Sequence, residues 1–232
     1  MFGHDPALAQ DAAAQPTDSM SRNDLVVAAI GGLGVVPIVV ASDAAHAEPL
    51  ASALKAGGLP CAEVTFRTQV AEATLRTLAA DPDLLVGAGT ILTREQADRA
   101  VTAGARFIVS PGLNKGLVRY CQEIGVAVIP GVATASEIQA ALDLGLELVK
   151  FFPAEPLGGI RMLDALAGPF PGLRFFPTGG IVRDLVATYL GHSAVHAVGG
   201  SWMVAQASMM AGQWDEVTRR CAEAVTTVRA LR

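Results

Sequence analysis

The sequence predicts an α/β fold, a single (β/α)8 TIM barrel preceded by an N-terminal helix. Eight short apolar runs alternate with eight helical segments at about 20–25 residues per unit, which is the pattern of this barrel. The chain has 232 residues, and a barrel of this kind typically needs about 250 residues. The alternative is a doubly wound open sheet, which usually carries a GxGxxG turn after its first strand. Here Ser42-Asp43-Ala44 follows the first predicted strand.

Each predicted strand is a short apolar run rich in β-branched or aromatic residues. In chain order these runs are Val35–Val40, Cys61–Phe66, Leu84–Ala88, Arg106–Ser110, Ala127–Pro130, Leu148–Phe152, Leu173–Pro177 and Val195–Val198. The first run contains Pro37, which suits the start of a strand better than its centre because proline donates no hydrogen bond to the ladder.

Several predicted helices carry capping residues at their ends. Ser21 can cap an N-terminal helix that Gly31-Gly32 is expected to end. Ser42 or Asp43 can cap the helix that runs to Lys55. The pair Thr93 and Gln96 fits a capping box for another helix. The other helices after the strands are expected over Val70–Ala80, Thr93–Ala103, Lys115–Ile124, Ser136–Leu144, Ile160–Ala167, Arg183–Leu190 and Trp214–Leu231.

The domain organisation follows from the unbroken alternation of strands and helices. Residues 21–232 are expected to form one barrel domain, since no linker interrupts the pattern. Residues 1–20 lack the basic start and the continuous apolar stretch of a secretory signal, and we interpret them as a disordered extension. The longest apolar candidate, residues 28–41, contains three glycines and a proline and falls short of the roughly 18 residues of a membrane helix. A cytoplasmic protein is therefore expected.

Composition excludes several classes of partner. The net charge is -5, so the chain lacks the basic footprint of a nucleic-acid-binding protein and the polybasic segment of a membrane-surface protein. The three cysteines, Cys61, Cys121 and Cys221, form no CxxC pair and are expected to be reduced, buried thiols. The four histidines have no ligand spacing with one another, so no metal site is expected.

Lys150 interrupts the sixth predicted strand, Leu148–Phe152. A parallel strand that is buried on both faces should be continuously apolar, and lysine is rarely buried unless it is paired or functional. A dry pocket disfavours an ammonium group, and a free amine can attack a ketone to form a Schiff base. The alternative is a lysine at the edge of the strand, with its stem packed and its head in water.

The second predicted strand places polar residues on one face. Alternation puts Cys61, Glu63, Thr65 and Arg67 on the same side, which predicts a polar barrel interior. A buried glutamate suits proton transfer near neutral pH. A purely structural Glu63–Arg67 ion pair explains the same pattern equally well.

The C-terminal ends of the strands are where this barrel carries its chemistry. The seventh and eighth strands are followed by the sequences 178–181, TGGI, and 199–202, GGSW. Barrels often bind phosphate with these two loops, through backbone N–H groups. The third strand is followed by Gly89-Thr90, where glycine lets another group approach closely. We interpret Trp202 as a packing residue and expect His196 to pack within or beside the eighth strand.

These motifs, in order and in register from Asp24 to Ala211, resemble the bacterial class I 2-keto-3-deoxy-6-phosphogluconate aldolases. Members of that family often also act on 4-hydroxy-2-oxoglutarate. The resemblance is carried by the segments 63–68 (EVTFRT), 87–90 (GAGT), 110–112 (SPG), 130–132 (PGV), 150–153 (KFFP), 178–181 (TGGI) and 199–202 (GGSW).

The resemblance implies a lyase that releases pyruvate and glyceraldehyde 3-phosphate without a cofactor, assembled as a homotrimer. Lys150 would form the Schiff base, and Glu63 would be the general acid and base. The remaining positions carried over are Arg67 and Thr90 for the pyruvyl carboxylate, Pro111 and Phe152 lining that end, and Gly179, Gly180 and Ser201 for the distal phosphate.

Three rival interpretations stay open on the sequence alone. The substrate could be the galactonate-derived isomer, which differs by one stereocentre. A phosphosugar isomerase or epimerase would use Glu63 as its base and Lys150 only as a charge. A phosphometabolite-binding barrel would have lost catalysis altogether. The fold by itself does not separate these activities, because this barrel hosts many of them.

Overall fold

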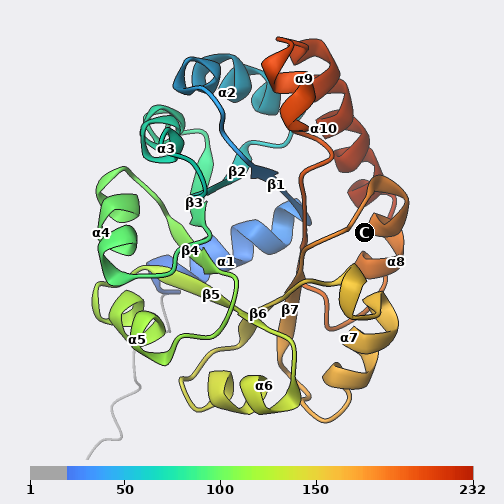
Figure 1. Cartoon of the computed structure of the whole chain (residues 1–232). Coiled ribbons are helices and arrows are strands. Elements are labelled where there is room, and N and C mark those ends of the chain that lie inside the picture. Colours follow the sequence, from blue (N-terminus) through green and yellow to red (C-terminus); the bar gives the residue numbers. More distant parts are fainter. Residues whose placement is uncertain (1–19, 232) are drawn as a thin grey trace, which may run out of the picture.

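The computed structural model describes residues 20–231, which form a nearly closed ring of eight parallel strands surrounded by helices (Figure 1). The strands are β1 (Val35–Val39), β2 (Cys61–Thr65), β3 (Leu85–Gly89), β4 (Phe107–Ser110), β5 (Ala127–Val132), β6 (Leu148–Phe151), β7 (Arg174–Pro177) and β8 (Val198–Gly200). The predicted (β/α)8 barrel is confirmed. The expected extension at residues 1–20 lies outside the described residues, apart from Met20.

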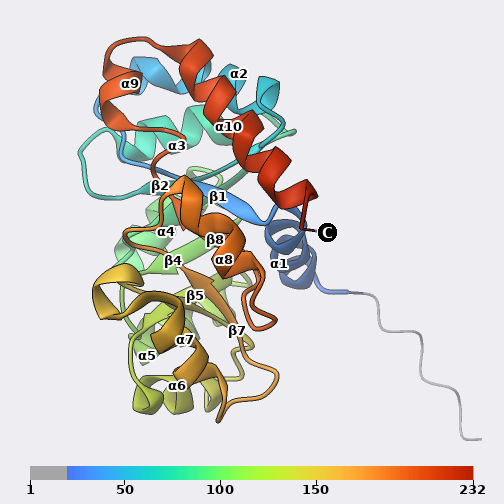
Figure 2. The same cartoon turned by 90° about the vertical axis from the view of Figure 1, so that its right-hand side faces the viewer.

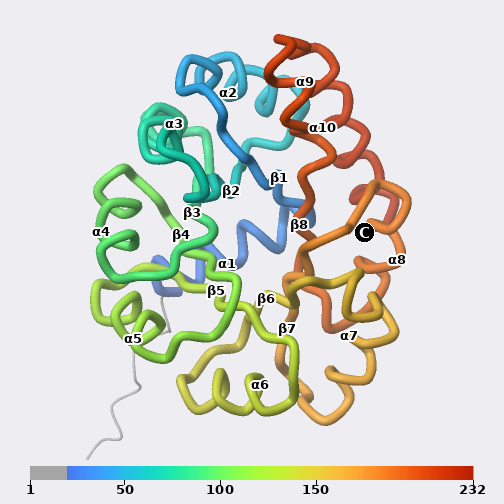
Figure 3. The backbone as a smooth tube through the Cα atoms, in the orientation of Figure 1, coloured from blue at the N-terminus to red at the C-terminus, as the bar shows by residue number. Residues whose placement is uncertain are grey.

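The ring closes because the last strand lies between the first and the seventh. The sheet order is β7-β6-β5-β4-β3-β2-β1-β8, and β8 pairs with β1 in parallel. Isolated bridges join Phe175 to Val195 and Thr178 to Gly199 across the remaining seam. The tube in Figure 3 shows β8 between β1 and β7. The alternative prediction of an open doubly wound sheet is therefore wrong.

The helices cover the outside of the ring, as the alternation predicted. They are α2 (Ala47–Ala56), α3 (Ala71–Ala79), α4 (Arg94–Thr102), α5 (Lys115–Glu123), α6 (Ala135–Leu142), α7 (Gly159–Ala167), α8 (Val186–Leu190), α9 (Gln206–Met210) and α10 (Trp214–Arg229). Single 3-10 turns are η1 (Ala44–His46), η2 (Glu155–Leu157) and η3 (Arg183–Leu185). The Thr93–Gln96 capping box is confirmed. Among the described residues, no helix is long and apolar enough to span a membrane.

Helix α1 (Arg22–Leu33) lies across one end of the barrel (Figure 2). Ser21 caps it, as predicted, in a capping box with Asp24. The expected end at Gly31-Gly32 is wrong, because the helix continues to a left-handed cap at Gly34 (φ 71°). A Cβ atom on Gly31 would lie 2.4 Å from the His196 ring. Gly31 therefore lets α1 pack directly against the chain that leads into β8.

His196 fastens α1 to the barrel. Its Nε2 donates to the carbonyl of Val27 at 2.8 Å, and Arg174 Nη1 lies 3.1 Å from its Nδ1. Since the ring lies two residues before β8, the expectation that it packs beside that strand is confirmed.

Two details of the strands differ from the sequence prediction. The eighth strand begins at Val198, not Val195, because its ladder to β1 runs through Val198, Gly199 and Gly200. Tertiary pairing here overrides the low strand propensity of glycine. Pro37 lies at the centre of β1, where the pairing of this strand passes from β8 to β2. The short helix α9 was not predicted.

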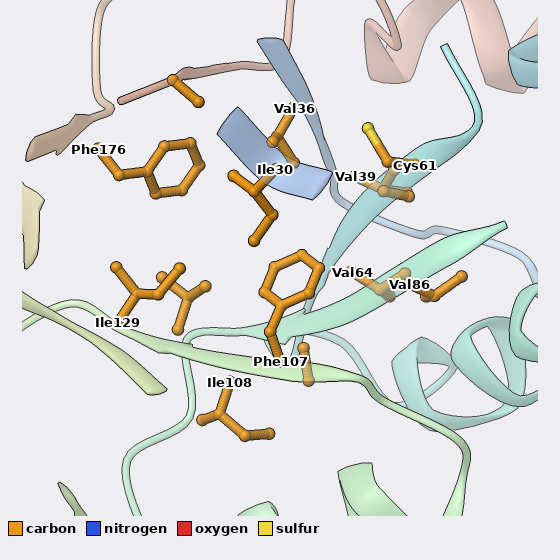
Figure 4. Packing of buried hydrophobic residues seen from close by; sticks show 14 of the residues in the cluster. Ile30, Val36, Val39, Cys61, Val64, Val86, Phe107, Ile108, Ile129 and Phe176 are labelled. Carbon is orange, nitrogen blue, oxygen red and sulfur yellow. The ribbon is translucent and has the colours of Figure 1, made fainter. Parts of the chain in front are cut away.

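The barrel interior is apolar at the end that α1 covers. In Figure 4 the side chains of Ile30, Phe107 and Phe176 point toward the middle of the barrel, whereas Val64 and Val86 lie on the outer side of their strands. All five are at most 1% exposed. A Cβ atom on Gly87 would lie 2.3 Å from the Phe107 ring, so a glycine in β3 gives this ring its space.

The three cysteines are free and buried, which confirms the predicted reduced thiols. Burial is the main cause that raises the pKa of Cys121 to about 11 and that of Cys221 to about 12. Thiolate, not thiol, is the reactive form, so these side chains serve as small apolar packing groups.

The Gly31 packing predicts opposite effects at two adjacent glycines. Gly31→Ala should lower the free energy of unfolding by about 1–3 kcal/mol, because overpacking displaces the His196 ring. Gly32→Ala should raise it by about 0.5–1 kcal/mol, because alanine is the better helix former and no described atom lies within 4 Å of the new methyl group. Guanidinium unfolding measures both, and equal effects of the two changes would contradict this packing.

Candidate active site

A cavity of about 530 Å³ opens at the C-terminal ends of the strands. It is bounded by side chains from both halves of the chain and by the loops after β7 and β8. Every residue predicted for the site lines it, namely Lys150, Glu63, Arg67, Thr90, Pro111, Phe152, Gly179, Gly180 and Ser201.

The centre of the cavity is a buried pair of opposite charges. Lys150 Nζ, from β6, lies 3.5 Å from Glu63 Oε1, from β2. Glu63 is 0% exposed and Lys150 is 6% exposed. The alternative prediction, that the Lys150 head lies in water, is therefore wrong. The Glu63–Arg67 ion pair is also wrong, since the carboxylate faces Lys150.

Glu63 occupies space that a glycine leaves for it. A Cβ atom on Gly89 would lie 2.1 Å from Glu63 Oε1, so any larger residue in β3 would displace the carboxylate. Neither oxygen of Glu63 accepts a hydrogen bond from a described residue. Buried polar atoms are nearly always hydrogen-bonded, and an orphaned carboxylate beside an amine suits proton exchange with a bound molecule.

Lys150 is framed by an aromatic ring and by a packed turn. Its Nζ lies 5.1 Å from the centroid of the Phe152 ring. Gly131, the register partner of Lys150 on β5, makes room for the Pro111 carbonyl, which would lie 2.1 Å from a Cβ atom there. Ser110 Oγ fastens the same turn by donating to the carbonyl of Gly112 at 2.8 Å.

The opposite wall carries Arg67 and the strained residue Thr90. Thr90 has φ 58°, the one left-handed non-glycine among residues 20–231. A β-branched residue in this conformation is a genuine outlier, and such strain clusters at functional sites. Arg67 is exposed, and no described carboxylate lies within ion-pair distance of it. Its guanidinium is therefore free of competition for an anionic ligand.

The loop after β7 presents its backbone to the cavity. Gly179 and Gly180 have φ values of 97° and 83°, which strongly favour glycine. The turn after β6 holds this loop, since the N–H of Glu155 donates to the carbonyl of Gly179 at 3.0 Å. A Cβ atom on Gly180 would lie 2.7 Å from Glu155 Cβ. The backbone N–H groups needed to bind an anion are therefore positioned by tertiary contacts.

Two supporting residues of this loop were missed by the sequence analysis. The Tyr189 hydroxyl, from α8, donates to Glu155 Oε1 at 2.5 Å. Burial and then the bond to Glu155 raise the pKa of Tyr189, so the hydroxyl stays a donor at neutral pH. The only sequence signal was Glu155, an acidic residue in the loop after the sixth strand.

One side chain departs from the predicted arrangement and another adds to it. Cys61 does not line the cavity, and its thiol donates to the carbonyl of Val35 at 3.7 Å. Trp202 packs against the core, as predicted, and it also lines the cavity. Within the described part of the chain, no three His, Cys, Asp or Glu side chains gather as a metal site.

The comparison with known families decides where this site belongs. A family model described as KDPG and KHG aldolase matches residues 26–220. The chain belongs to the KDPG and KHG aldolase family. This assignment confirms the resemblance seen in the motifs, and it makes the chain an aldolase, which is a carbon–carbon lyase.

Relatives of this aldolase agree in sequence and in structure. The 2-dehydro-3-deoxy-phosphogluconate aldolase of Treponema pallidum is 50% identical over 185 residues, 79% of this chain and 88% of that protein. A Legionella pneumophila KDPG aldolase structure, with pyruvate captured at low pH as a covalent carbinolamine, is 41% identical with a TM-score of 0.83 over 88% of this chain and 98% of that one. A Zymomonas mobilis enzyme with 3-phosphoglycerate is 39% identical with a TM-score of 0.82, covering 88% and 97% of the two chains.

The strain at Thr90 predicts opposite effects on stability and on catalysis. Thr90→Gly should leave the free energy of unfolding unchanged or raise it by up to about 1 kcal/mol, because relief of the left-handed backbone offsets the entropy of glycine. The value of kcat/KM for the aldolase substrate should fall. Thermal unfolding and steady-state kinetics measure the two effects.

The matched control is Thr77→Gly on α3, where the backbone is helical. This change should lower the free energy of unfolding by about 0.3 kcal/mol and leave kcat/KM unaltered. A clear loss of stability in Thr90→Gly would contradict the strain argument.

Proposed function

We propose that this aldolase cleaves 2-keto-3-deoxy-6-phosphogluconate to pyruvate and glyceraldehyde 3-phosphate through a Schiff base on Lys150. We propose that it also cleaves 4-hydroxy-2-oxoglutarate to pyruvate and glyoxylate. The observation that carries the proposal is the buried Lys150–Glu63 pair, which places an amine 3.5 Å from a carboxylate and beside the Phe152 ring. In that pair, Lys150 can supply the nucleophile and Glu63 can relay the protons.

The first half of the reaction forms the imine. The amine of Lys150 attacks the C2 ketone of the keto acid and gives a carbinolamine. Loss of water then needs a proton on the departing hydroxyl, which Glu63 can deliver across the 3.5 Å that separates it from Lys150 Nζ. The captured carbinolamine of the Legionella pneumophila relative supports this route.

The second half breaks the carbon–carbon bond. Glu63 accepts the proton of the C4 hydroxyl, the C3–C4 bond cleaves, and its electrons pass into the cationic imine to form an enamine. The C4 fragment leaves as the aldehyde. Protonation at C3 and hydrolysis of the imine then release pyruvate and restore the amine. One well-placed acid–base group typically contributes about 10²–10⁴-fold.

The two ends of the substrate are assigned to opposite walls of the cavity. Arg67 would bind the pyruvyl carboxylate with its planar fork, helped by the Thr90 hydroxyl. Pro111 and Phe152 would line this end and exclude water. The phosphate would bind the loops after β7 and β8, to the N–H groups of Gly179 and Gly180 and to the Ser201 hydroxyl.

The rival interpretations are less well supported. The curated relative at 50% identity is named for the gluconate-derived substrate, which favours that stereochemistry over the galactonate isomer. A phosphosugar isomerase or a binding barrel would not need the covalent chemistry captured in the Legionella pneumophila enzyme. We also propose the homotrimer that the resemblance implies and the cytoplasmic location that the sequence pattern leads us to expect. Light scattering of the purified protein tests the homotrimer.

Borohydride reduction in the presence of pyruvate tests the mechanism. We expect one pyruvyl adduct, mapped to Lys150 by peptide mass spectrometry. Lys150→Ala should abolish both the adduct and the cleavage. Lys150→Arg is the matched control for charge, since it keeps the cation beside Glu63 but has no amine that forms an imine, and it too should be inactive. Cleavage near the wild-type rate in either variant would overturn the Schiff-base assignment.

The Ser201 hydroxyl tests the assignment of the phosphate end. Ser201→Ala should raise KM for 2-keto-3-deoxy-6-phosphogluconate by about tenfold, the value of one hydrogen bond to a charged acceptor. KM for 4-hydroxy-2-oxoglutarate should change less than about twofold, because this substrate has no phosphate to accept a hydrogen bond from the Ser201 hydroxyl. Equal losses on the two substrates would count against the phosphate assignment.

A further inference from the structure

We propose that the indole N–H of Trp202 is a further binding group of this enzyme, and that it donates a hydrogen bond to an oxygen of the substrate's phosphate. The inference deepens the proposed function and rests on it. It gives Trp202 a ligand-binding role in addition to packing.

The first observation is an orphaned donor. Nε1 of Trp202 is buried, and no described residue accepts a hydrogen bond from it. Tryptophan can only donate, and buried tryptophans usually find a partner for their N–H. Because Trp202 is one of the residues that line the cavity, this unpaired donor points to an acceptor on the molecule that the cavity binds.

The second observation is the position of the indole at the junction of two loops. A Cβ atom on Gly200 would lie 3.0 Å from Trp202 Nε1 and 3.4 Å from the carbonyl of Ile181. The edge of the indole and the Ile181 carbonyl therefore both lie beside Gly200, where the loop after β8 meets the loop that contains Gly179 and Gly180. Both loops line the same cavity as Trp202.

The third observation is that the protein fixes the backbone of Trp202. Arg220 Nη1, from α10, donates to the carbonyl of Trp202 at 3.1 Å, and Arg220 Nε donates to Glu216 Oε1 at 2.7 Å. Bonds from Arg219 first, and from Arg220, lower the pKa of Glu216 to about 2, so this anchor stays charged at neutral pH. Met203 and Val204, which follow Trp202, are at most 1% exposed.

These constraints select the chemistry of the acceptor. The donor is neutral, its residue is held through the Trp202 carbonyl by Arg220, and it lines the same cavity as Gly179, Gly180 and Ser201, an arrangement that suits a phosphate oxygen with several free lone pairs. A ligand without a phosphate, such as 4-hydroxy-2-oxoglutarate, would leave the indole N–H unused. Trp202 would therefore contribute to discrimination between the two substrates.

The test compares two Trp→Phe variants. Trp202→Phe keeps the ring but removes the N–H, and we expect KM for 2-keto-3-deoxy-6-phosphogluconate to rise about tenfold, as for one bond to a charged acceptor. KM for 4-hydroxy-2-oxoglutarate should change less than about twofold. Trp214→Phe is the control, because Trp214 packs edge-on against His46 outside the cavity. It should alter neither KM.

Tryptophan fluorescence gives a second readout, and its main measurement leaves Trp202 unchanged. The chain has two tryptophans, so Trp214→Phe leaves Trp202 as the only emitter. Inorganic phosphate should change this emission saturably, with a midpoint equal to its inhibition constant against the phosphorylated substrate. The emission of Trp202→Phe, which reports Trp214 alone, should not respond to phosphate.

The outcomes separate this inference from the proposed function. Equal changes of KM on both substrates in Trp202→Phe, or no response of the Trp202 emission to phosphate, would overturn the role of the indole. In either case borohydride trapping of pyruvate on Lys150 would still succeed in wild type if the proposed function is right. Failure of that trapping would overturn the proposed function itself.

Discussion

The buried ion pair between Lys150 and Glu63 is the constraint on which the rest of the structure depends. Removing two charges from water is costly, and their attraction compensates only when the geometry is good. The barrel meets this demand by facing β2 against β6 across its interior, and Gly89 supplies the space for the carboxylate. Loss of either partner would leave an uncompensated buried charge, so the pair restricts both the register of the strands and the residues around it.

The interior of the barrel is divided along its axis to meet this demand. The end beneath α1 is filled by rings and aliphatic side chains such as Phe107, Phe176 and Ile30. This packing supplies stability that does not depend on the site. The opposite end, at the carboxyl ends of the strands, holds the polar groups. Because one end of the barrel is apolar and the other is polar, the enzyme can keep the Lys150 amine out of bulk water while a charged substrate enters at the carboxyl ends of the strands.

Unusual backbone conformations and unpaired polar atoms occur together in the residues that line the cavity. Thr90 has a left-handed backbone, and buried polar atoms of Glu63, Thr178 and Trp202 have no partner among the described residues, although all four residues line one cavity. Each departure costs stability, and real proteins accept such costs at functional sites. Hydrogen bonds from the Glu155 N–H to the Gly179 carbonyl and from Arg220 to the Trp202 carbonyl hold the backbone of the two loops beside these residues.

The sequence by itself determined the barrel, because the alternation of strands and helices is a local property. Through motifs that resemble the aldolase family, it also predicted nine residues that line one cavity. A charged residue such as Lys150 inside an apolar strand also stands out locally. Tertiary structure alone decided that Glu63 faces Lys150 and not Arg67, that Gly31 continues a helix against His196, and that Trp202 is part of the cavity lining. The reason is physical: these outcomes depend on which distant groups meet once the ring closes, and alternation along one strand carries no information about its neighbours across the barrel.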